Sequence, residues 1–395
     1  TNLSFNRSDA LILNKVISGT GNVTKNGAGN LTLTATNTYQ GVTTIAAGTL
    51  IVGDGGTNGS IDATSSIVDN GTLIFNRSDN ITLSKAVTGT GSLTQAGAGI
   101  LSLTAENTYS GVTRIEQGTL SIGAGGTTGS IANISNAVNN GTLMFNRSDD
   151  VSLNAPISGL GNLTQAGTGN LTLRGNSTYT GNTTVSSGTM IVGDGATNGS
   201  ITTSANIINN ANLTFNRSDA TNYTSNLSGN STANLQQAGS GLLTFSGNGS
   251  AYLGNVTLTA GTVSLNASNA VGPSNGGTIS FNGGTLQYTS NFNSDNSARF
   301  STANNQQVKI DTNGQQITFA TGLNSNGGSL TKLGTGNLTL VATNTYTGST
   351  TINAGTLIVG DGGTNGTIDA TSSIVDNGTL IFNHSGPVVL AKVIS

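Results

Sequence analysis

A positive and a negative side chain recur together along the chain at a fixed interval. The pentapeptide Phe-Asn-Arg-Ser-Asp begins at positions 5, 75, 145 and 215, so its copies are evenly spaced and define a 70-residue repeat. Residues two apart on a strand share a face, so each arginine and aspartate can form a local ion pair worth about 0–1 kcal/mol. The alternative is a row of arginines that binds an anionic glycan. The candidate interaction surface therefore includes Arg7, Asp9, Arg77, Asp79, Arg147, Asp149, Arg217 and Asp219.

Aromatic residues offer a second chemistry, because aromatic rings can stack on sugar rings. Four tyrosines occupy matching points of a Thr-Tyr-x-Gly motif: Tyr39, Tyr109, Tyr179 and Tyr346. We expect each ring to pack over a turn with its hydroxyl in water. Eight of the 17 aromatic residues lie between residues 220 and 330. Core filling is the first interpretation of that cluster, and a segment that contacts a partner, with Tyr288, Phe292 and Arg299 on its surface, is the alternative.

The segment Gly53–Asp62, with the sequence GDGGTNGSID, contains oxygen ligands of the kind that calcium prefers. Asp54 is replaced by Ala124 in the next repeat, and the nine-residue calcium-binding pattern is not met. The glycines and asparagines of this segment are typical of turns. We therefore predict a turn here, with no bound metal and no cofactor.

Catalytic groups are scarce. The chain has no cysteine and a single histidine, His384, whose counterparts in other repeats are arginines. A nucleophilic triad would thus depend on one residue. A carboxylate pair of the kind found in polysaccharide-cleaving enzymes would have to be unique in the chain, and Asp295 and Asp311 are the candidates. Near-identical repeats argue against a single active site, so we predict that the chain is not an enzyme.

The composition defines the protein class. Charged residues are 7% of 395, the net charge is −3 and the isoelectric point is about 4.9. No basic patch suits nucleic acid, and no run approaches the ~20 apolar residues of a membrane helix. Gly, Asn, Thr and Ser disfavour helices, whereas short alternating runs such as Asn30–Leu33 indicate strands.

The repeats predict an all-β solenoid, because a short coil cannot bury its inner face alone and must stack on the next. Residues 36–76 and 343–383 differ at four of 41 positions. We expect about 23 residues per coil and three coils per 70-residue repeat, which would place equivalent residues on the same side. Regular repeats are predicted at 1–219 and, truncated, at 331–395. Between them, 220–330 is predicted to be irregular, with about 27 extra residues.

The phrases LTKLGTGNLTLVATNTYTGSTTINAGTLIVGDGG (Leu330–Gly363) and FNGGTLQY (Phe281–Tyr288) resemble the autotransporter-associated β-strand repeat of bacterial type V secreted proteins. The resemblance implies a right-handed parallel β-helix passenger, exported to the bacterial cell surface through a C-terminal membrane barrel. The end AKVIS echoes NKVIS at residues 14–18, so we expect a piece of a longer array, without the barrel or a signal peptide.

These observations predict a surface adhesin, a rigid rod whose outward Thr, Ser and Asn side chains mediate self-association in cell aggregation and biofilm, or attachment to glycans or host proteins. The partners are then a second copy or a surface ligand, with no nucleic acid and no membrane span. The alternatives are a passive stalk that displays an adhesive tip, a polysaccharide-cleaving β-helix, and an ice-binding array of Thr-x-Thr pairs such as Thr32 and Thr34.

Overall fold

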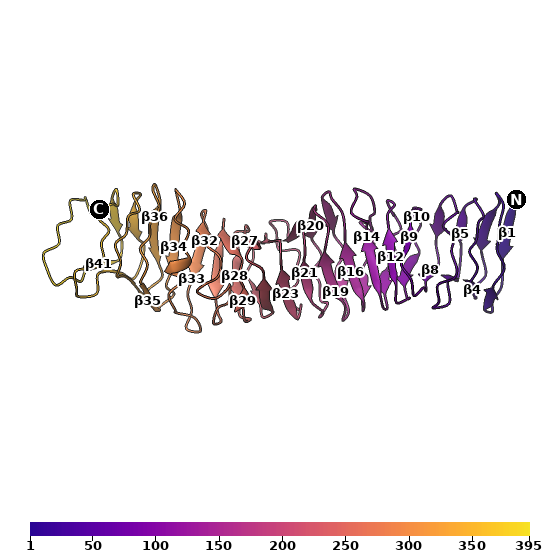
Figure 1. Cartoon of the computed structure of the whole chain (residues 1–395), viewed down its shortest axis with the longest axis horizontal. Coiled ribbons are helices and arrows are strands. Elements are labelled where there is room, and N and C mark those ends of the chain that lie inside the picture. The colour runs from indigo at the N-terminus through magenta and orange to yellow at the C-terminus, as the bar shows by residue number, and fades with distance from the viewer. The chain divides into compact units, whose positions relative to one another are not determined.

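The computed structural model describes residues 1–395, and its one helical element is the short 3-10 turn η1 (Ser297–Arg299) (Figure 1). The chain forms two compact units, each a parallel β-helix. The N-terminal unit comprises residues 1–192 and 198–205, and the C-terminal unit comprises 193–197 and 206–395. Every strand pair within each unit is parallel, as the right-handed parallel β-helix implied by the resemblance requires. No helix in the structure has the length and apolar character needed to cross a membrane.

The strands of the N-terminal unit belong to four sheets, named here by their first strand. The β1 sheet contains β1 (Asn2–Phe5), β3 (Asn22–Lys25), β5 (Thr43–Ile45), β7 (Ile67–Asp69) and β10 (Val87–Thr88). The β2 sheet contains β2 (Leu11–Leu13), β4 (Asn30–Leu33), β6 (Thr49–Val52), β8 (Thr72–Phe75), β11 (Ser92–Gln95), β13 (Thr113–Ile115), β15 (Ala137–Asn139) and β18 (Ile157–Ser158). The β9 sheet contains β9 (Ile81–Leu83), β12 (Ile100–Leu103), β14 (Thr119–Ile122), β16 (Thr142–Phe145), β19 (Asn162–Gln165) and β21 (Thr183–Val185). The β17 sheet contains β17 (Val151–Leu153), β20 (Asn170–Leu173) and β22 (Thr189–Val192).

The C-terminal unit repeats the arrangement with four sets of paired strands. The first contains β23 (Asn206–Asn209), β26 (Asn226–Gly229) and β29 (Ala251–Tyr252), and the second β24 (Asn212–Phe215), β27 (Asn234–Gln237), β30 (Asn255–Leu258) and β32 (Ile279–Phe281). The third contains β25 (Thr221–Tyr223), β28 (Leu242–Phe245), β31 (Thr262–Leu265), β33 (Thr285–Gln287), β34 (Gln307–Asp311), β36 (Ser329–Leu333), β38 (Thr350–Ile352) and β40 (Ile374–Asp376). The fourth contains β35 (Gln316–Phe319), β37 (Asn337–Leu340), β39 (Thr356–Val359) and β41 (Thr379–Phe382).

The coils are shorter than the sequence predicted. In the β2 sheet, Leu11 lies beside Leu31, Leu31 beside Leu50, and Leu50 beside Leu73. The same ladder continues through Leu93, Thr113 and Ala137 and ends at Ile157, so seven coils separate Leu11 from Ile157. A coil therefore averages about 21 residues, near the lower end of the periods known for solenoids. The 70-residue repeat then makes about three and a third coils rather than three.

The extra third of a coil moves each repeat onto the next side of the β-helix. The equivalent residues Phe5, Phe75 and Phe145 end strands β1, β8 and β16, which lie in three different sheets of the N-terminal unit. The expectation that residues one repeat apart share a side was therefore wrong. The prediction assumed coils of about 23 residues, three of which make up one 70-residue repeat. The observed coils average about 21 residues, so three of them are shorter than the repeat.

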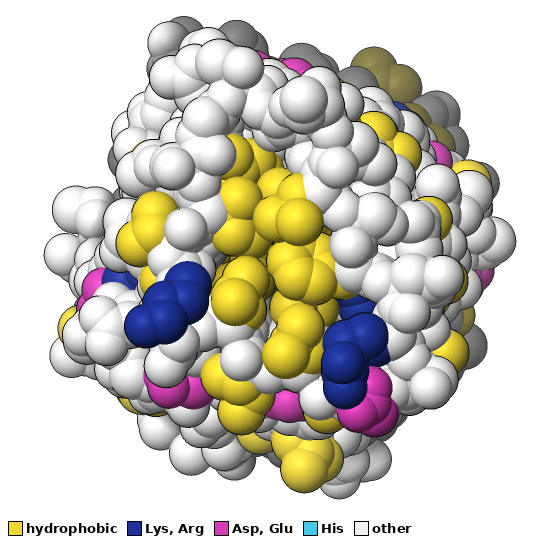
Figure 2. Space-filling view, turned by 90° about the vertical axis from the view of Figure 1, so that its right-hand side faces the viewer, with side chains coloured by type: hydrophobic (Ala, Val, Ile, Leu, Met, Phe, Trp, Pro, Cys, Tyr) yellow, Lys and Arg dark blue, Asp and Glu magenta, His cyan; other side chains and the backbone are white.

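The core follows from strict alternation along each strand. In β4, Leu31 and Leu33 are fully buried, whereas Asn30 and Thr32 face outward. Complete burial of such a leucine contributes about 1.5–3 kcal/mol. Viewed from the N-terminal end, hydrophobic side chains gather at the centre of the coil within a polar surround (Figure 2). Stacked inward leucine, isoleucine and valine side chains thus form a continuous core within each unit.

Buried lysine and glutamine side chains at the ends of the Leu-Thr-Lys and Leu-Thr-Gln stretches donate hydrogen bonds to carbonyls of the turns that follow. Gln95 donates from Nε2 to the carbonyls of Gly97 and Gly99 at 2.8 and 3.0 Å. Lys332, at the equivalent place, donates to the carbonyls of Gly334 and Ala354 at 2.7 and 3.1 Å. Burial lowers the pKa of Lys332 to about 8. These side chains supply the donors that the turning backbone cannot provide for its own carbonyls.

Asp69, the last residue of β7, is fully buried, and its Oδ2 atom has no hydrogen-bond partner. The equivalent residue of the next repeat is Asn139, whose amide donates to the carbonyl of Asn162 at 2.7 Å. A carboxylate cannot make this bond, but a carboxylic acid can. Burial raises the pKa of Asp69 to about 6. An ionised Asp69 is therefore poorly compensated at neutral pH.

The substitution Asp69→Asn should stabilise the protein at pH 7 and change little at pH 4. Unfolded aspartate titrates near 3.8, so the folded state binds more protons between about pH 4 and 6, and stability falls as pH rises through that window. Asparagine removes this loss, which is about 2–3 kcal/mol at pH 7. Thermal unfolding at both pH values measures it. Asp54→Asn, on an exposed loop, is the control and should have no effect. Equal gains at pH 4 and pH 7 would contradict the titration argument.

Candidate functional site

In the regular repeats, a glycine-rich loop connects two strands and exposes several of its side chains. In the first repeat, residues 53–60 connect β6 to the next corner, and Asp54, Thr57 and Asn58 are exposed. The loop needs glycine at Gly53 and Gly59, where φ is 90° and 94° and an added Cβ would collide with backbone atoms. The Asp54 carboxylate accepts a 3.3 Å hydrogen bond from the Gly56 amide, which closes the turn.

The arginine of the next pentapeptide clamps this loop. Arg77 donates from Nη1 to the carbonyl of Gly59 and from Nη2 to the carbonyl of Thr57. The same guanidinium donates to both carboxylate oxygens of Asp79, at 2.8 Å from Nε and 2.7 Å from Nη2. These bonds lower the pKa of Asp79. In this repeat, the arginine and the aspartate of the pentapeptide together brace the glycine-rich loop that precedes them.

The second copy of the clamp has the same geometry. Arg147 donates to the carbonyls of Gly129 and Thr127, and to Asp149 at 2.9 and 2.7 Å. Glu106 adds an oxygen 3.2 Å from Nη1. The pKa of Arg147 is raised, chiefly because Asp149 accepts its hydrogen bonds. The loop carbonyls, the guanidinium and the carboxylate thus form one closed network.

This network decides between the two interpretations of the arginines. The side chains of Arg77, Arg147 and Arg217 are 12%, 10% and 9% exposed. Their guanidinium groups are ion-paired at 2.7 Å with Asp79, Asp149 and Asp219. Arg7 differs, because it is 53% exposed and bonds Asp9 at 2.6 Å. A row of arginines that binds an anionic glycan does not fit this burial, and the bracing interpretation does.

The remaining candidate surface residues are inside the protein. Tyr288, Phe292 and Arg299 are 0%, 8% and 3% exposed, so the prediction that they form a contact surface was wrong. Tyr288 and Phe292 stack with ring centroids 6.2 Å apart. Arg299 donates to the carbonyls of Gly277, Gly272 and Val271 at 2.8, 3.1 and 3.1 Å. It repeats the clamp on a different loop, and burial lowers its pKa to about 10.

The tyrosines of the Thr-Tyr-x-Gly motif are also buried. The Tyr39 hydroxyl lies 2.6 Å from Oγ1 of Thr43, which donates at 2.9 Å to Oγ1 of Thr64. Thr64 in turn donates to the Gly41 carbonyl at 2.7 Å. The same tyrosine–threonine bond recurs in the other repeats, at Tyr109, Tyr179 and Tyr346. The expectation of a wet hydroxyl was wrong, because a threonine four residues on supplies the partner.

The carboxylates considered for catalysis cap backbone amides. Asp295 accepts hydrogen bonds from the amides of Ser297 and Ala320 at 2.7 and 2.9 Å. Asp311 accepts from the Asn313 amide and from the Gln287 side chain, both at 2.8 Å. The structure contains no group of three or more His, Cys, Asp or Glu side chains that could hold a metal ion. Both aspartates are therefore explained by turn geometry.

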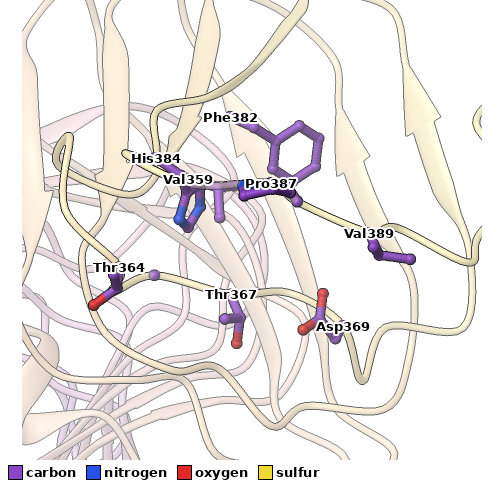
Figure 3. Close-up of a pocket in the computed structure, with 10 residues that line it drawn as sticks. Val359, Thr364, Thr367, Asp369, Phe382, His384, Pro387 and Val389 are labelled. Atoms are coloured by element: carbon purple, nitrogen blue, oxygen red, sulfur yellow. The ribbon is translucent and has the colours of Figure 1, made fainter.

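His384 occupies the place of the clamp arginine in the last repeat, and a cavity of about 160 Å³ lies beside it. Figure 3 shows His384 and Phe382 on one side of this cavity, and Thr364, Thr367 and Asp369 on the other. The His384 Nε2 atom is buried without a hydrogen-bond partner. No sequence signal other than the exchange of arginine for histidine at this position pointed to the cavity.

Comparison with known proteins identifies the repeated element. The passenger-associated-transport-repeat family matches residues 23–52, 93–122, 163–192, 235–265 and 330–359. The adhesin BmaC autotransporter of Brucella suis biovar 1 is 33% identical over 172 residues, which cover 39% of this chain and 5% of that protein. No solved structure matches the chain. The first matched segment runs from β3 to the end of β6 at Val52, so the glycine-rich loop of residues 53–60 begins immediately after it and Arg77 lies farther along the chain.

Removing a clamp arginine should free its loop while leaving the core folded. Arg77→Ala leaves two loop carbonyls and Asp79 without their donor, and we expect a local cost of about 2–4 kcal/mol. Amide hydrogen exchange at Gly55 and Ser78, which bond Asn76 and Gly56 in this network, measures the cost. Arg7→Ala is the control and should cost about 0–1 kcal/mol, because that pair is exposed. Equal losses in both variants would refute the clamp.

Proposed function

We propose that this chain is part of an autotransporter passenger, that it is adhesive, and that it self-associates through its outward polar surface. The five segments that match the passenger-associated-transport-repeat family support this proposal. Passengers of this type stand at the cell surface or are secreted. The matched relative is named an adhesin. A structural and interaction role, rather than catalysis, is the part of the proposal that the repeated architecture supports best.

The observation that carries the proposal is a pair of threonines, pointing away from the core, that recurs on different sheets. Thr24 of β3 and Thr44 of β5 lie side by side in the β1 sheet. Their equivalents two repeats later, Thr164 and Thr184, lie side by side in the β9 sheet. Since each repeat turns by one third, the same hydroxyl pairs face different directions. Two of these directions therefore present the same hydroxyl pair, whereas the intermediate repeat presents Arg114 beside the buried Thr94.

Low charge favours contact between copies. With 7% charged residues and a net charge of −3, two such surfaces approach with little repulsion. A single hydroxyl or amide contact contributes about 0.5–1.5 kcal/mol net. Many such contacts along adjacent coils add through multivalency. Self-association of this kind needs no pocket, which agrees with the clamped loops and buried aromatic residues described above.

Charge placed on one face should weaken self-association in part, and charge on two faces should abolish it. Thr24→Lys with Thr44→Lys charges the β1 sheet, and Thr164→Lys with Thr184→Lys charges the β9 sheet. Sedimentation velocity over a wide concentration range measures association, with circular dichroism as the check on folding. The matched control replaces the same threonines by serine and should associate as the native chain does.

The outcome separates adhesion from a stalk. Association that weakens with each lysine pair and disappears with both supports the polar surface. A native chain that stays monomeric at every concentration contradicts self-association and favours a passive stalk. If the chain still associates with all four lysines present, the contact does not lie on the β1 and β9 sheets, and the proposed surface is wrong.

A further inference from the structure

The fourth described copy of the glycine-rich loop has lost its arginine clamp. Residues 360–367 read GDGGTNGT, which differs from residues 53–60 at the last position alone. The pentapeptide that follows reads Phe-Asn-His-Ser-Gly, so His384 replaces the arginine and Gly386 replaces the aspartate. Both members of the ion pair are therefore absent from this copy.

The loop nevertheless keeps the backbone framework of the clamped copies. The amides of Gly360 and Gly362 donate to the carbonyls of Leu340 and Asn383 at 2.9 and 2.8 Å. In the first repeat the corresponding amides, those of Gly53 and Gly55, donate at 3.0 and 2.8 Å. The Asp361 carboxylate closes the same turn, accepting a 3.0 Å bond from Gly363. The carbonyls that receive a guanidinium in the other repeats are thus held in place here as well.

Histidine is too short to fill the space of the arginine. The His384 Nε2 atom lies beside the backbone of Gly360, where the clamp arginine places its Cγ. Beyond it lies the cavity of about 160 Å³, lined by Thr364, Gly366 and Asp369 (Figure 3). No hydrogen bond of the chain reaches the Thr364 or Gly366 carbonyl, which correspond to the Thr57 and Gly59 carbonyls that Arg77 binds.

We propose that this cavity binds a guanidinium group from outside the chain, carried by an arginine side chain of a second polypeptide. The two free carbonyls accept two N–H groups of the planar fork, as they do from Arg77 in the first repeat. The Asp369 carboxylate lines the same cavity and takes the role of the absent aspartate. The apolar wall of Val359 and Phe382 suits the methylene stem of an arginine.

The donor pattern selects among cations. A guanidinium carries five N–H donors in a rigid plane, so it can reach both carbonyls and the carboxylate together. An ammonium ion is compact and strongly hydrated, and it fits a site shaped for the larger fork less well. An anion is excluded by the carbonyl oxygens and by Asp369.

The first test is a titration with N-ethylguanidinium, at concentrations well below those that denature proteins. We expect saturable amide shifts at Gly360 and Gly366 in nuclear magnetic resonance spectra, and roughly threefold weaker binding of ethylammonium. His384→Arg should fill the cavity, raise the thermal midpoint of the free protein and weaken binding by about tenfold or more. Absence of saturable shifts, or equal binding by His384→Arg, would overturn the proposal.

A matched gain of function provides the control. Arg77→His combined with Asp79→Gly reproduces the last repeat within the first loop, and it should raise the number of guanidinium sites from one to two. The second set of shifts should fall at Gly53 and Gly59. If this variant unfolds locally, the His384→Arg result decides alone. If it stays folded and gains no site, the vacant clamp is not sufficient for binding and the proposal fails.

The source of the guanidinium is tested with a peptide. An acetylated, amidated Gly-Arg-Gly peptide should bind at least as tightly as N-ethylguanidinium, because its backbone can follow the open mouth of the cavity. A peptide that fails to bind while the small cation does would overturn the polypeptide source and leave a small free guanidinium compound as the ligand.

Discussion

Backbone carbonyls at the corners of the coils are the constraint on which the rest of the structure depends. Along the strands the parallel ladders pair the backbone groups of neighbouring coils, but the turns between strands leave carbonyls without a backbone partner. Gln95 and Lys332 satisfy them from within the core, Thr64 does so beneath the tyrosine, and Arg77 does so from outside the glycine-rich loop. The side chains that the sequence suggested as binding residues thus include several that donate hydrogen bonds to backbone carbonyls. Side chains that resemble binding residues in the sequence are therefore already occupied in the fold.

The fold could be predicted because its signals are local. The alternation in Asn30–Leu33 fixes which side chains are inside, and the repetition of near-identical segments requires stacking. The coil length could not be read from the 70-residue period, because it is set by the turns between strands. The coil from Leu11 to Leu31 is shorter than the coil from Leu50 to Leu73, and the difference between them is the length of a loop.

The site was harder to predict than the fold, for a physical reason. The sequence alone suggests that Arg77 forms an exposed ion pair with Asp79, yet its side chain is only 12% exposed. The loop of the preceding coil, residues 53–60, covers it and is distant from it in the sequence. Arg299 and Tyr288 were surface candidates because they lie in the stretch predicted to be irregular. In the structure Arg299 binds three backbone carbonyls and Tyr288 is fully buried, and neither fact can be read from the local sequence.

Each 70-residue repeat advances the chain by about a third of a coil beyond three full coils. The number of repeats therefore determines the direction, about the β-helix axis, in which the following strands face. Gain or loss of one 70-residue segment within the N-terminal unit would shift every later strand of that unit onto the neighbouring sheet. The core would tolerate the exchange, since the inward residues are interchangeable from repeat to repeat. The direction in which those later strands face would rotate by about a third of a turn about the β-helix axis. Gain or loss of three repeats would restore the original direction. Length variation in such an array would therefore re-aim its distal parts as well as extend them.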